Sequence, residues 1–312
     1  MTNKHYFTLA DYYEKIFHKK IAKIALNTNF TCPNKDGTKG RGGCTYCSKL
    51  GSGDTAGDVN LPLELQYLQV QKRIVRKWPN ASYIFYLQAN SNTYADINTL
   101  KTLYERVLQI DPLRTAGLSI ATRPDCFSID IYNYLEELNK RTHLTIELGL
   151  QTSNEQTAKL INRCSTNDEF ITAVLNLRKR NIEVVVHIIN GLPLETKEDM
   201  MNTIDFLNQL DINGIKFHSL LVLKDTLLYK QYQENPFPLL SLEEYASIVT
   251  EQIRRLKPNV VIHRLAADAP KNDVVLPDWT QKKLVIMNTI DKLFKENDYH
   301  QGDLFTKPIQ NH

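Results

Sequence analysis

The chain has 312 residues, a formal net charge of +3 at pH 7 and 42% hydrophobic residues. This length and apolar content are enough to bury a large core, as one large domain or as a domain with an appendage. The near-neutral charge excludes a histone-like basic tail. No apolar run reaches transmembrane length, and the first residues lack the apolar core of a signal peptide, so we expect a cytoplasmic protein that does not contact membranes.

Strand-like and helix-like segments alternate along the first two-thirds of the chain. The expected strands cover residues 22–27, 83–88, 116–121, 144–150, 183–189 and 214–222. The expected helices cover residues 63–78, 97–110, 129–140, 154–162, 168–180 and 197–210. Repeated strand–helix units with short connections predict a parallel sheet with right-handed crossovers. Six such units predict an α/β fold, a partial (β/α)6 barrel like that of the TIM type.

The pattern changes after residue 225. A Pro-rich turn at residues 236–238 precedes a helix at 242–256, a short strand at 260–265 and a last helix at 281–296. We therefore expect the sheet to end near Val222. Residues 1–225 would form the barrel, and residues 226–312 a small C-terminal α+β extension that caps it.

Three of the five cysteines, Cys32, Cys44 and Cys47, lie on one loop directly after the first expected strand. Such clustering indicates a metal or catalytic site in a reducing compartment rather than a disulfide framework. A structural zinc ion takes four ligands, so a zinc site would need His18 or another residue to complete it. Three thiolates suit a four-iron cluster whose fourth iron stays open to another molecule. The loop's glycines permit a tight path around a cluster, and its position puts it at the carboxyl ends of the strands, where parallel barrels bind ligands.

This loop, with its last two cysteines in the pattern Cys-x-Tyr-Cys, resembles that of the radical S-adenosylmethionine (SAM) superfamily. Eleven and then two residues separate the cysteines, which is similar to the elongator-catalytic-subunit and coproporphyrinogen-dehydrogenase branches. Among these the chain most resembles the YhcC/YtqA-type subfamily. The resemblance runs from Tyr12-Tyr13 to residues 263–270 and so covers essentially the whole chain.

The resemblance implies two cofactors and a mechanism. A [4Fe-4S] cluster held by Cys32, Cys44 and Cys47 would bind the amine and carboxylate of SAM at its open iron. One electron, delivered by a flavodoxin- or ferredoxin-type reductant, would cleave SAM and give a 5′-deoxyadenosyl radical that abstracts a hydrogen atom from the substrate.

The resemblance also assigns cofactor contacts at the ends of strands. Gln88 and Asn90 match a segment beside the amino group of SAM, although residues 88–94 would also suit a solvated turn. Gln151 matches a residue near the ribose and adenine. Arg163 matches a residue that pairs with the SAM carboxylate, for which its guanidinium fork is suited, with a surface ion pair as the alternative.

Further along the chain, Asn190 and Gly191 match the family's loop beneath the adenine. Two positions depart from the family pattern, because His187 and Ala121 stand where relatives often have acidic residues. How the ribose is held is therefore left open. We expect His187 to be a satisfied core histidine.

Two other groups are candidates for contact with the substrate. Cys126, at a strand end, would face the cavity as a hydrogen-atom donor, with an inert buried thiol as the alternative. Neither Cys126 nor Cys164 has a Cys-x-x-Cys partner, so a second cluster is not expected. Polar and aromatic residues of the C-terminal segment would cap the barrel and select the substrate, or else simply pack the extension: His263, Arg264, Asp268, Lys271 and Trp279.

The resemblance to the elongator branch suggests tRNA as the substrate. Abstraction of a hydrogen atom beside nitrogen in a carboxymethylaminomethyl group, at C5 of the wobble uridine, would allow loss of the carboxymethyl unit and leave an aminomethyl group. A methyltransferase acting on that product would be a possible partner. The alternatives are a radical SAM enzyme for a small, porphyrin-like molecule and a non-catalytic protein that binds an Fe–S cluster or haem.

Overall fold

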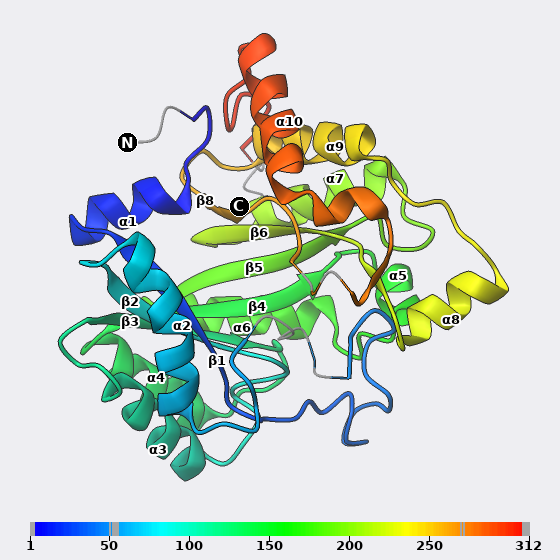
Figure 1. The fold of residues 1–312 in the computed structure, drawn as a ribbon. Helices are drawn as coiled ribbons and strands as arrows, with labels where there is room; N and C mark the ends of the chain where they lie inside the picture. Colours follow the sequence, from blue (N-terminus) through cyan, green and yellow to red (C-terminus); the bar gives the residue numbers. More distant parts are fainter. Residues whose placement is uncertain (1–3, 50, 52–55, 269, 271, 308–312) are drawn as a thin grey trace, which may run out of the picture.

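The computed structural model describes residues 4–49, 51, 56–268, 270 and 272–307 (Figure 1). Its centre is a curved sheet of parallel strands in the order β1-β2-β3-β4-β5-β6-β8. These strands are Ile21–Asn27 (β1), Ser82–Gln88 (β2), Thr115–Thr122 (β3), His143–Gln151 (β4), Glu183–Asn190 (β5), Gly214–Ser219 (β6) and Val261–Arg264 (β8). The strands run in sequence order across the sheet, as repeated right-handed crossovers require. The expected α/β fold, a partial TIM-like barrel with a C-terminal extension, is confirmed.

Helices cover the outer face of this sheet (Figure 1). They are Leu63–Lys77 (α2), Ile97–Leu108 (α3), Ile129–Asn139 (α4), Asn167–Lys179 (α6), Lys197–Asn208 (α7), Leu242–Arg255 (α9) and Lys283–Glu296 (α10). Three of them begin at capping boxes, in which Thr166, Thr196 and Ser241 each exchange hydrogen bonds with an acidic residue three positions on. These local signals explain why the helix starts are close to the expected ones.

The strands alternate between an apolar outer face and a polar inner face. Ile215 and Phe217 of β6 are fully buried against the helices as part of the main core. Lys216 and His218, between and after them, face the interior of the curved sheet, because successive side chains of a strand point to opposite sides. The main core therefore lies between sheet and helices, and the barrel interior is left to polar side chains.

The sheet does not end near Val222 as expected. The short strand β8, which the expected boundary places in the extension, pairs in parallel with β6 through Ile215 and Ile262. Pairing with β8 covers an edge of β6 that would otherwise expose unpaired backbone groups. Sequence pattern alone showed a strand here but not its partner.

The remaining elements lie around the rim of the sheet. Helix α1 (Leu9–Phe17), which the sequence reading did not include, precedes β1, and Phe7 just before it accepts a hydrogen bond from the Ile262 amide at 2.8 Å. The short helices are Glu155–Leu160 (α5), Leu227–Glu234 (α8) and the 3-10 turn Asp278–Gln281 (η1), and Val222–Leu223 (β7) pairs with Val274–Leu276 (β9). Among the described residues, no helix is long and apolar enough to span a membrane.

Candidate functional site

The cysteine loop, residues 28–47, leaves the carboxyl end of β1 and is tied to the connection between α5 and α6. The amides of Lys35 and Asp36 donate to the Cys32 carbonyl at 2.8 and 3.2 Å, and the Cys47 amide donates to the Cys44 carbonyl at 3.0 Å. Asn162 donates through Nδ2 to the Gly43 carbonyl at 2.8 Å. The backbone bonds shape the loop from within, and the Asn162 bond ties it to the segment between α5 and α6.

One glycine of this loop is required by close packing. A Cβ at Gly40 would collide with Oδ1 of Asn34 and would lie 2.9 Å from Sγ of Cys164. Any larger residue here would displace Asn34, whose Nδ2 bonds to the Asn162 carbonyl. Gly40 therefore allows the loop to follow its compact path past Asn34.

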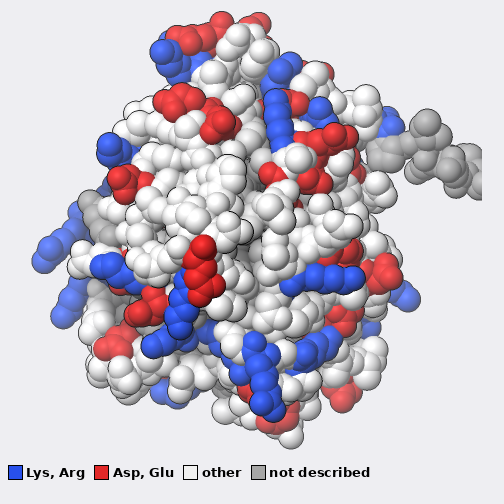
Figure 2. Space-filling model, turned by 90° about the vertical axis from the view of Figure 1, so that its right-hand side faces the viewer, with Lys and Arg blue, Asp and Glu red and all other residues white. Residues whose placement is uncertain are grey.

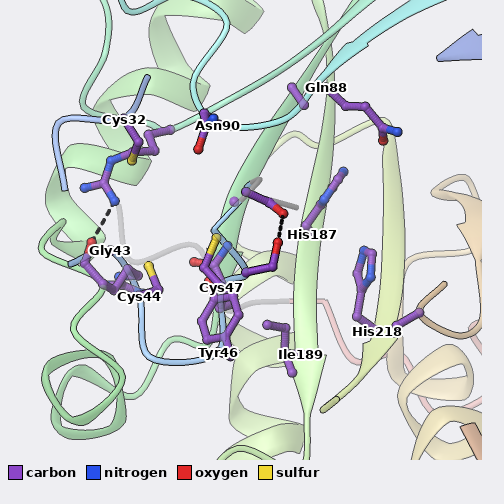
Figure 3. Close-up of a pocket in the computed structure, with 18 of the residues that line it drawn as sticks. Cys32, Gly43, Cys44, Tyr46, Cys47, Gln88, Asn90, His187, Ile189 and His218 are labelled. Carbon is purple, nitrogen blue, oxygen red and sulfur yellow. Dashed lines mark hydrogen bonds between the residues drawn. The ribbon is translucent and has the colours of Figure 1, made fainter. Parts of the chain in front are cut away.

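Cys32, Cys44 and Cys47 all line one open cavity at the carboxyl ends of the strands (Figure 3). Figure 3 shows Asn90 on the side of the cysteines, and Gln88, His187 and His218 on the far side of the cavity. Arg123 also lines the cavity. Burial raises the pKa of the Cys44 thiol, and the nearby Arg123 guanidinium lowers it by a smaller amount. The cavity therefore has a thiol end and a histidine end.

Polar residues at the ends of β2 and β4 line the same cavity, with backbone in unusual conformations. Ala89, Asn90 and Gln151 have φ values of 71°, 56° and 64°, in the left-handed region that L-residues seldom adopt. The register between β4 and β5 shifts between Gly149 and Gln151. Strain of this kind is concentrated at ligand sites, where it aims side chains that regular strands would aim elsewhere.

Two polar atoms on this wall have no hydrogen-bond partner. Asn90 Oδ1 and Ser91 Oγ are buried and unpartnered, although Asn90 Nδ2 donates to the Phe30 carbonyl at 2.9 Å. A buried polar atom without a partner is costly, and a bound ligand with a donor would remove that cost. The expected positions Gln88, Asn90 and Gln151 thus line the same cavity as the cysteines, and their contact with SAM stays a prediction.

Arg163 is placed differently from the expectation of an open carboxylate fork. Its side chain is 2% exposed, and it donates to the carbonyls of Leu150, Thr152 and Ser165 at 2.9, 2.7 and 2.8 Å. Its remaining nitrogen faces Glu155 and Asn167 at 3.4 and 3.2 Å. Arg163 lines the cavity, and its donors bond to the backbone at the end of β4. Its pairing with the SAM carboxylate stays a prediction.

Asn190 and Gly191 are not among the residues that line the cavity. The Asn190 side chain exchanges two hydrogen bonds, of 2.7 and 2.9 Å, with Gln252 of α9. A Cβ at Gly191 would meet Leu240 at 3.1 Å. Both residues thus face packed protein in this structure, which the local sequence could not show because Gln252 is far away in the chain.

Cys126 is also outside the cavity lining. It is buried, its Sγ lies 3.9 Å from Asp125 Oδ1, and burial raises its pKa to about 12. These surroundings are those of an inert thiol, so the structure does not bring the expected hydrogen-atom donor to the cavity.

The expected substrate residues fall into three groups. Arg264 and Asp268 line the cavity and face each other at 3.3 Å. Trp279 does not, because its Nε1 donates to the Leu240 carbonyl at 2.8 Å and its ring packs on Tyr245. His263 is outside the cavity lining, with a buried and unpartnered Nδ1. Lys271 lies outside the described residues.

The main feature that sequence reasoning missed is a charged network at the histidine end. Glu147 is 1% exposed and accepts from Lys23 Nζ at 2.7 Å, from Ser119 Oγ at 2.7 Å and from Lys216, and it bonds to His187 Nε2 at 2.7 Å. His187 is therefore satisfied, as expected, but it also lines the cavity. The signal available in the sequence was a polar residue at every second position of several strands.

Comparison with known protein families shows which family the chain belongs to. The radical SAM superfamily matches residues 11–207, and the radical SAM C-terminal domain matches residues 212–296. The chain is 42% identical to YtqA of Bacillus subtilis over 98% of this chain and 94% of that protein.

The chain belongs to the radical SAM superfamily of enzymes.

Other comparisons agree with this assignment. YhcC of Escherichia coli is 30% identical over 94% of this chain and 93% of that protein. Among solved structures, the archaeal Elp3 of Methanocaldococcus infernus has a TM-score of 0.69 at 18% identity, over 91% of this chain and 64% of that chain. This last likeness shows the shared fold.

The cofactors of the radical SAM family are a [4Fe-4S] cluster and SAM, and the donor set of this chain fits them. Three thiols on one loop at one end of a cavity match three irons and leave one iron open. The unpartnered atoms of Asn90 and Ser91 offer hydrogen bonds beside that end. His18, the candidate fourth ligand of a zinc ion, is exposed at the end of α1 and does not line the cavity, so it would not complete a zinc site there.

Proposed function

We propose that this radical SAM enzyme modifies tRNA at the C5 side chain of the wobble uridine, converting a carboxymethylaminomethyl group to an aminomethyl group. The C–N bond to the carboxymethyl unit would be oxidised and then hydrolysed by water, so that this unit leaves as glyoxylate. SAM would be the two-electron oxidant and would leave as 5′-deoxyadenosine and methionine. The observation that carries the radical chemistry is the cavity itself, in which three cysteines of one loop face Gln88, Asn90 and Gln151. When bound, the cluster and SAM would supply the radical that abstracts a hydrogen atom from the substrate.

The chain's own residues hold and orient these cofactors. Cys32, Cys44 and Cys47 would bind three irons, and the tied-down cysteine loop keeps them at one end of the cavity. Asn90 Oδ1 is free to accept a hydrogen bond from an ammonium group, and Gln151 is turned into the cavity by its left-handed backbone. The walls of the barrel limit access of water to a reactive intermediate.

A likeness to tRNA-modifying proteins supports the choice of substrate. The chain is 24% identical, over 48% of its length, to tRNA-2-methylthio-N(6)-dimethylallyladenosine synthase of Thermotoga petrophila. The face that carries the cysteine loop and α8 has Lys and Arg side chains spread among Asp and Glu (Figure 2). This face does not show the basic patch that is typical of nucleic-acid binding, so the choice of tRNA rests on the sequence likeness.

The first test is anaerobic reconstitution with iron and sulfide, followed by an assay for 5′-deoxyadenosine with dithionite, with and without bulk tRNA. We expect product that tRNA stimulates, and we expect Cys44→Ala to abolish it. Cys164→Ser is the matched control, since Cys164 is exposed on a neighbouring segment and is not part of the cavity. Product that is indifferent to tRNA would favour a small-molecule substrate, and a cluster without any product would favour a non-catalytic protein.

The second test identifies the modified group. Nucleosides of total tRNA from a strain lacking the gene are compared with those of the parent and of a strain carrying the Cys44→Ala gene. We expect carboxymethylaminomethyl uridine to accumulate in the deletion and Cys44→Ala strains at the expense of aminomethyl-derived uridine. An unchanged nucleoside profile would refute the proposed substrate.

A further inference from the structure

The histidine end of the cavity is built from one row of inner-face residues. The parallel register places Lys216 of β6 beside His187 of β5 on one side and beside Arg264 of β8 on the other. Glu147 of β4 reaches His187 and Lys216 from the neighbouring strand. Charged side chains of four strands thus meet inside the barrel, where low polarity strengthens every interaction between them.

The charges of this row do not balance. Glu147 is the shared partner of both Lys23 and Lys216, and its oxygens already receive four contacts. Arg264 adds a third cation, and its ion-pair partner among the described residues is Asp268, at 3.3 Å. Asp268 is shared in turn with Lys283, at 2.8 Å. Of these three cations Arg264 lines the cavity, whereas Lys23 and Lys216 are not among its lining residues. The three cations share two carboxylates, and one of these, Asp268, also pairs with Lys283.

The neighbouring titratable groups respond to this surplus of positive charge. Burial is the largest cause that lowers the pKa of Lys216 to about 7, and Lys23 and Arg264 lower it further against the opposing effect of Glu147. Burial and Lys216 lower the pKa of His187 to about 4. The pKa of His218 is held well below its usual value by burial, His187 and Arg264. The imidazoles are thus neutral, so they add no charge of their own.

Two groups beside these cations also lack hydrogen-bond partners. His218 Nε2 and Ser219 Oγ are buried and unpartnered, and both residues line the cavity. In Figure 3, His187 and His218 lie side by side across the cavity from Cys32. Arg264, whose partner Asp268 is shared with Lys283, and the two unsatisfied side chains of His218 and Ser219 thus line the same cavity.

We propose that the histidine end of the cavity binds a carboxylate of the substrate, with Arg264 as the principal donor. The guanidinium of Arg264 matches the two oxygens of a carboxylate, and His218 and Ser219 offer further hydrogen bonds. A carboxylate here would offset part of the positive charge that Arg264 and the neighbouring lysines bring to this row. The inference rests on the proposed function in that the substrate enters this cavity. It explains how a carboxymethylaminomethyl group would be selected over the aminomethyl product, which has no carboxylate.

Binding is measured on the reconstituted protein without turnover. The first probe pair is 5-carboxymethylaminomethyluridine and its methyl ester. The binding of each compound is measured by calorimetry in the presence of SAM. We expect the acid to bind at least about tenfold more tightly than the ester, since a hydrogen bond to a charged group contributes about 1.5–3 kcal/mol. Arg264→Gln should remove this difference and leave the affinity for the ester unchanged, and Arg264→Lys should give an intermediate result. Arg106→Gln, which removes an exposed guanidinium outside the cavity lining, is the matched control and should keep the full difference.

A second probe pair separates this inference from the proposed tRNA substrate. N-acetylglycine and N-acetylglycinamide carry no uridine, and their weak binding is detected by saturation-transfer NMR. Arg264-dependent binding of N-acetylglycine alone would keep the carboxylate site even if tRNA is not the substrate. Equal binding of acid and neutral probe, or no binding of either pair, would overturn the inference.

Two further arms distinguish other anions. If Arg264→Gln weakens the binding of SAM as much as it weakens the binding of the acid probe, Arg264 binds the carboxylate of the cofactor. The inference then fails. If inorganic phosphate displaces N-acetylglycine at a lower concentration than acetate does, the site is a phosphate site and the inference also fails.

Discussion

Glu147 is the residue on which the barrel interior depends, because it is buried and neutralises two lysines and fixes one imidazole. Its pKa is held well below the usual value, because Lys216, Lys23 and His187 together outweigh the effect of burial. A carboxylate with this many partners stabilises the fold mainly by preventing uncompensated charge in the interior.

Removing the charge of Glu147 should therefore destabilise the protein strongly. We expect Glu147→Gln to lower the free energy of unfolding by about 3–5 kcal/mol, since it leaves Lys23 and Lys216 buried without a counter-ion. Urea denaturation followed by circular dichroism gives the value. The matched control is Glu64→Gln, which breaks the exposed pair with Arg106 and should cost at most about 1 kcal/mol. A similar small loss in both variants would contradict the role assigned to Glu147.

His187 makes a specific contribution to the pH dependence of stability. Its pKa falls from 6.5 in the unfolded chain to about 4 in the fold, chiefly through burial and Lys216. Between these values the unfolded chain binds a proton that the folded protein does not bind, so stability falls as the pH drops from 6.5 towards 4.

We expect His187→Asn to flatten this fall by as much as about 1.4 kcal/mol per pH unit within that window. The measurement is the unfolding free energy at several pH values between 4 and 7. His18→Asn, at the exposed end of α1, is the control and should keep the slope of the parent protein. Parallel curves for parent and His187→Asn proteins would rule out this contribution.

At the scale of elements, the contact between β5 and α9 joins the two matched family regions. Gln252 is fully buried, bonds reciprocally to Asn190 and donates to the Met200 carbonyl at 3.0 Å. The end of β5, which runs to the cavity, is thereby fixed from the C-terminal part of the chain.

This contact predicts a coupled pair of substitutions. Asn190→Leu and Gln252→Leu should each cost about 1–3 kcal/mol, because each leaves a buried amide without its partner. The double variant should lose less than the sum of the two, as expected for residues in direct contact. Denaturation curves give the coupling, and calorimetry with SAM tests the role expected from the sequence. A large loss of SAM affinity in Asn190→Leu, with unchanged stability, would favour a cofactor contact over the packing seen here.

The strand β8 shows most clearly where sequence reasoning about elements reached its limit. The residues Val260 to Leu265 were expected to form a strand, and they do so between Val261 and Arg264. Its place beside β6 could not be predicted, because about forty residues separate the two strands. The residue pattern of a strand does not show which other strand it pairs with. The same pairing brings Arg264, a substrate candidate from the sequence, beside Lys216, which sequence reasoning did not single out.

At the scale of the whole molecule, the expected boundary at residue 225 crosses a continuous sheet. We expect the fragment 1–225 to be insoluble or partly unfolded, because it exposes the edge of β6 and the apolar surface that α9 and α10 cover. Size-exclusion chromatography and thermal unfolding of this fragment, beside the full chain, provide the measurement. A monomeric fragment that unfolds cooperatively would show that residues 226–312 are an independent appendage.

Several properties of this protein were determined by the sequence itself. The three cysteines and their spacing indicate a cluster, and the alternation of strands and helices predicts the parallel sheet, because both signals are local in the chain. The helix starts follow for the same reason, since a capping box is complete within four residues.

The tertiary structure decided which polar residues share a cavity. The Asn190 side chain bonds to Gln252 rather than facing the cavity, and the Arg163 guanidinium bonds to backbone carbonyls. Both residues nevertheless match family positions. Glu147, Lys216, His218 and Arg264 come together only when β4, β6 and β8 are placed in register, and their pKa values follow from that proximity and burial. Charge balance in a cavity depends on distances between distant parts of the chain, and a single sequence does not contain those distances.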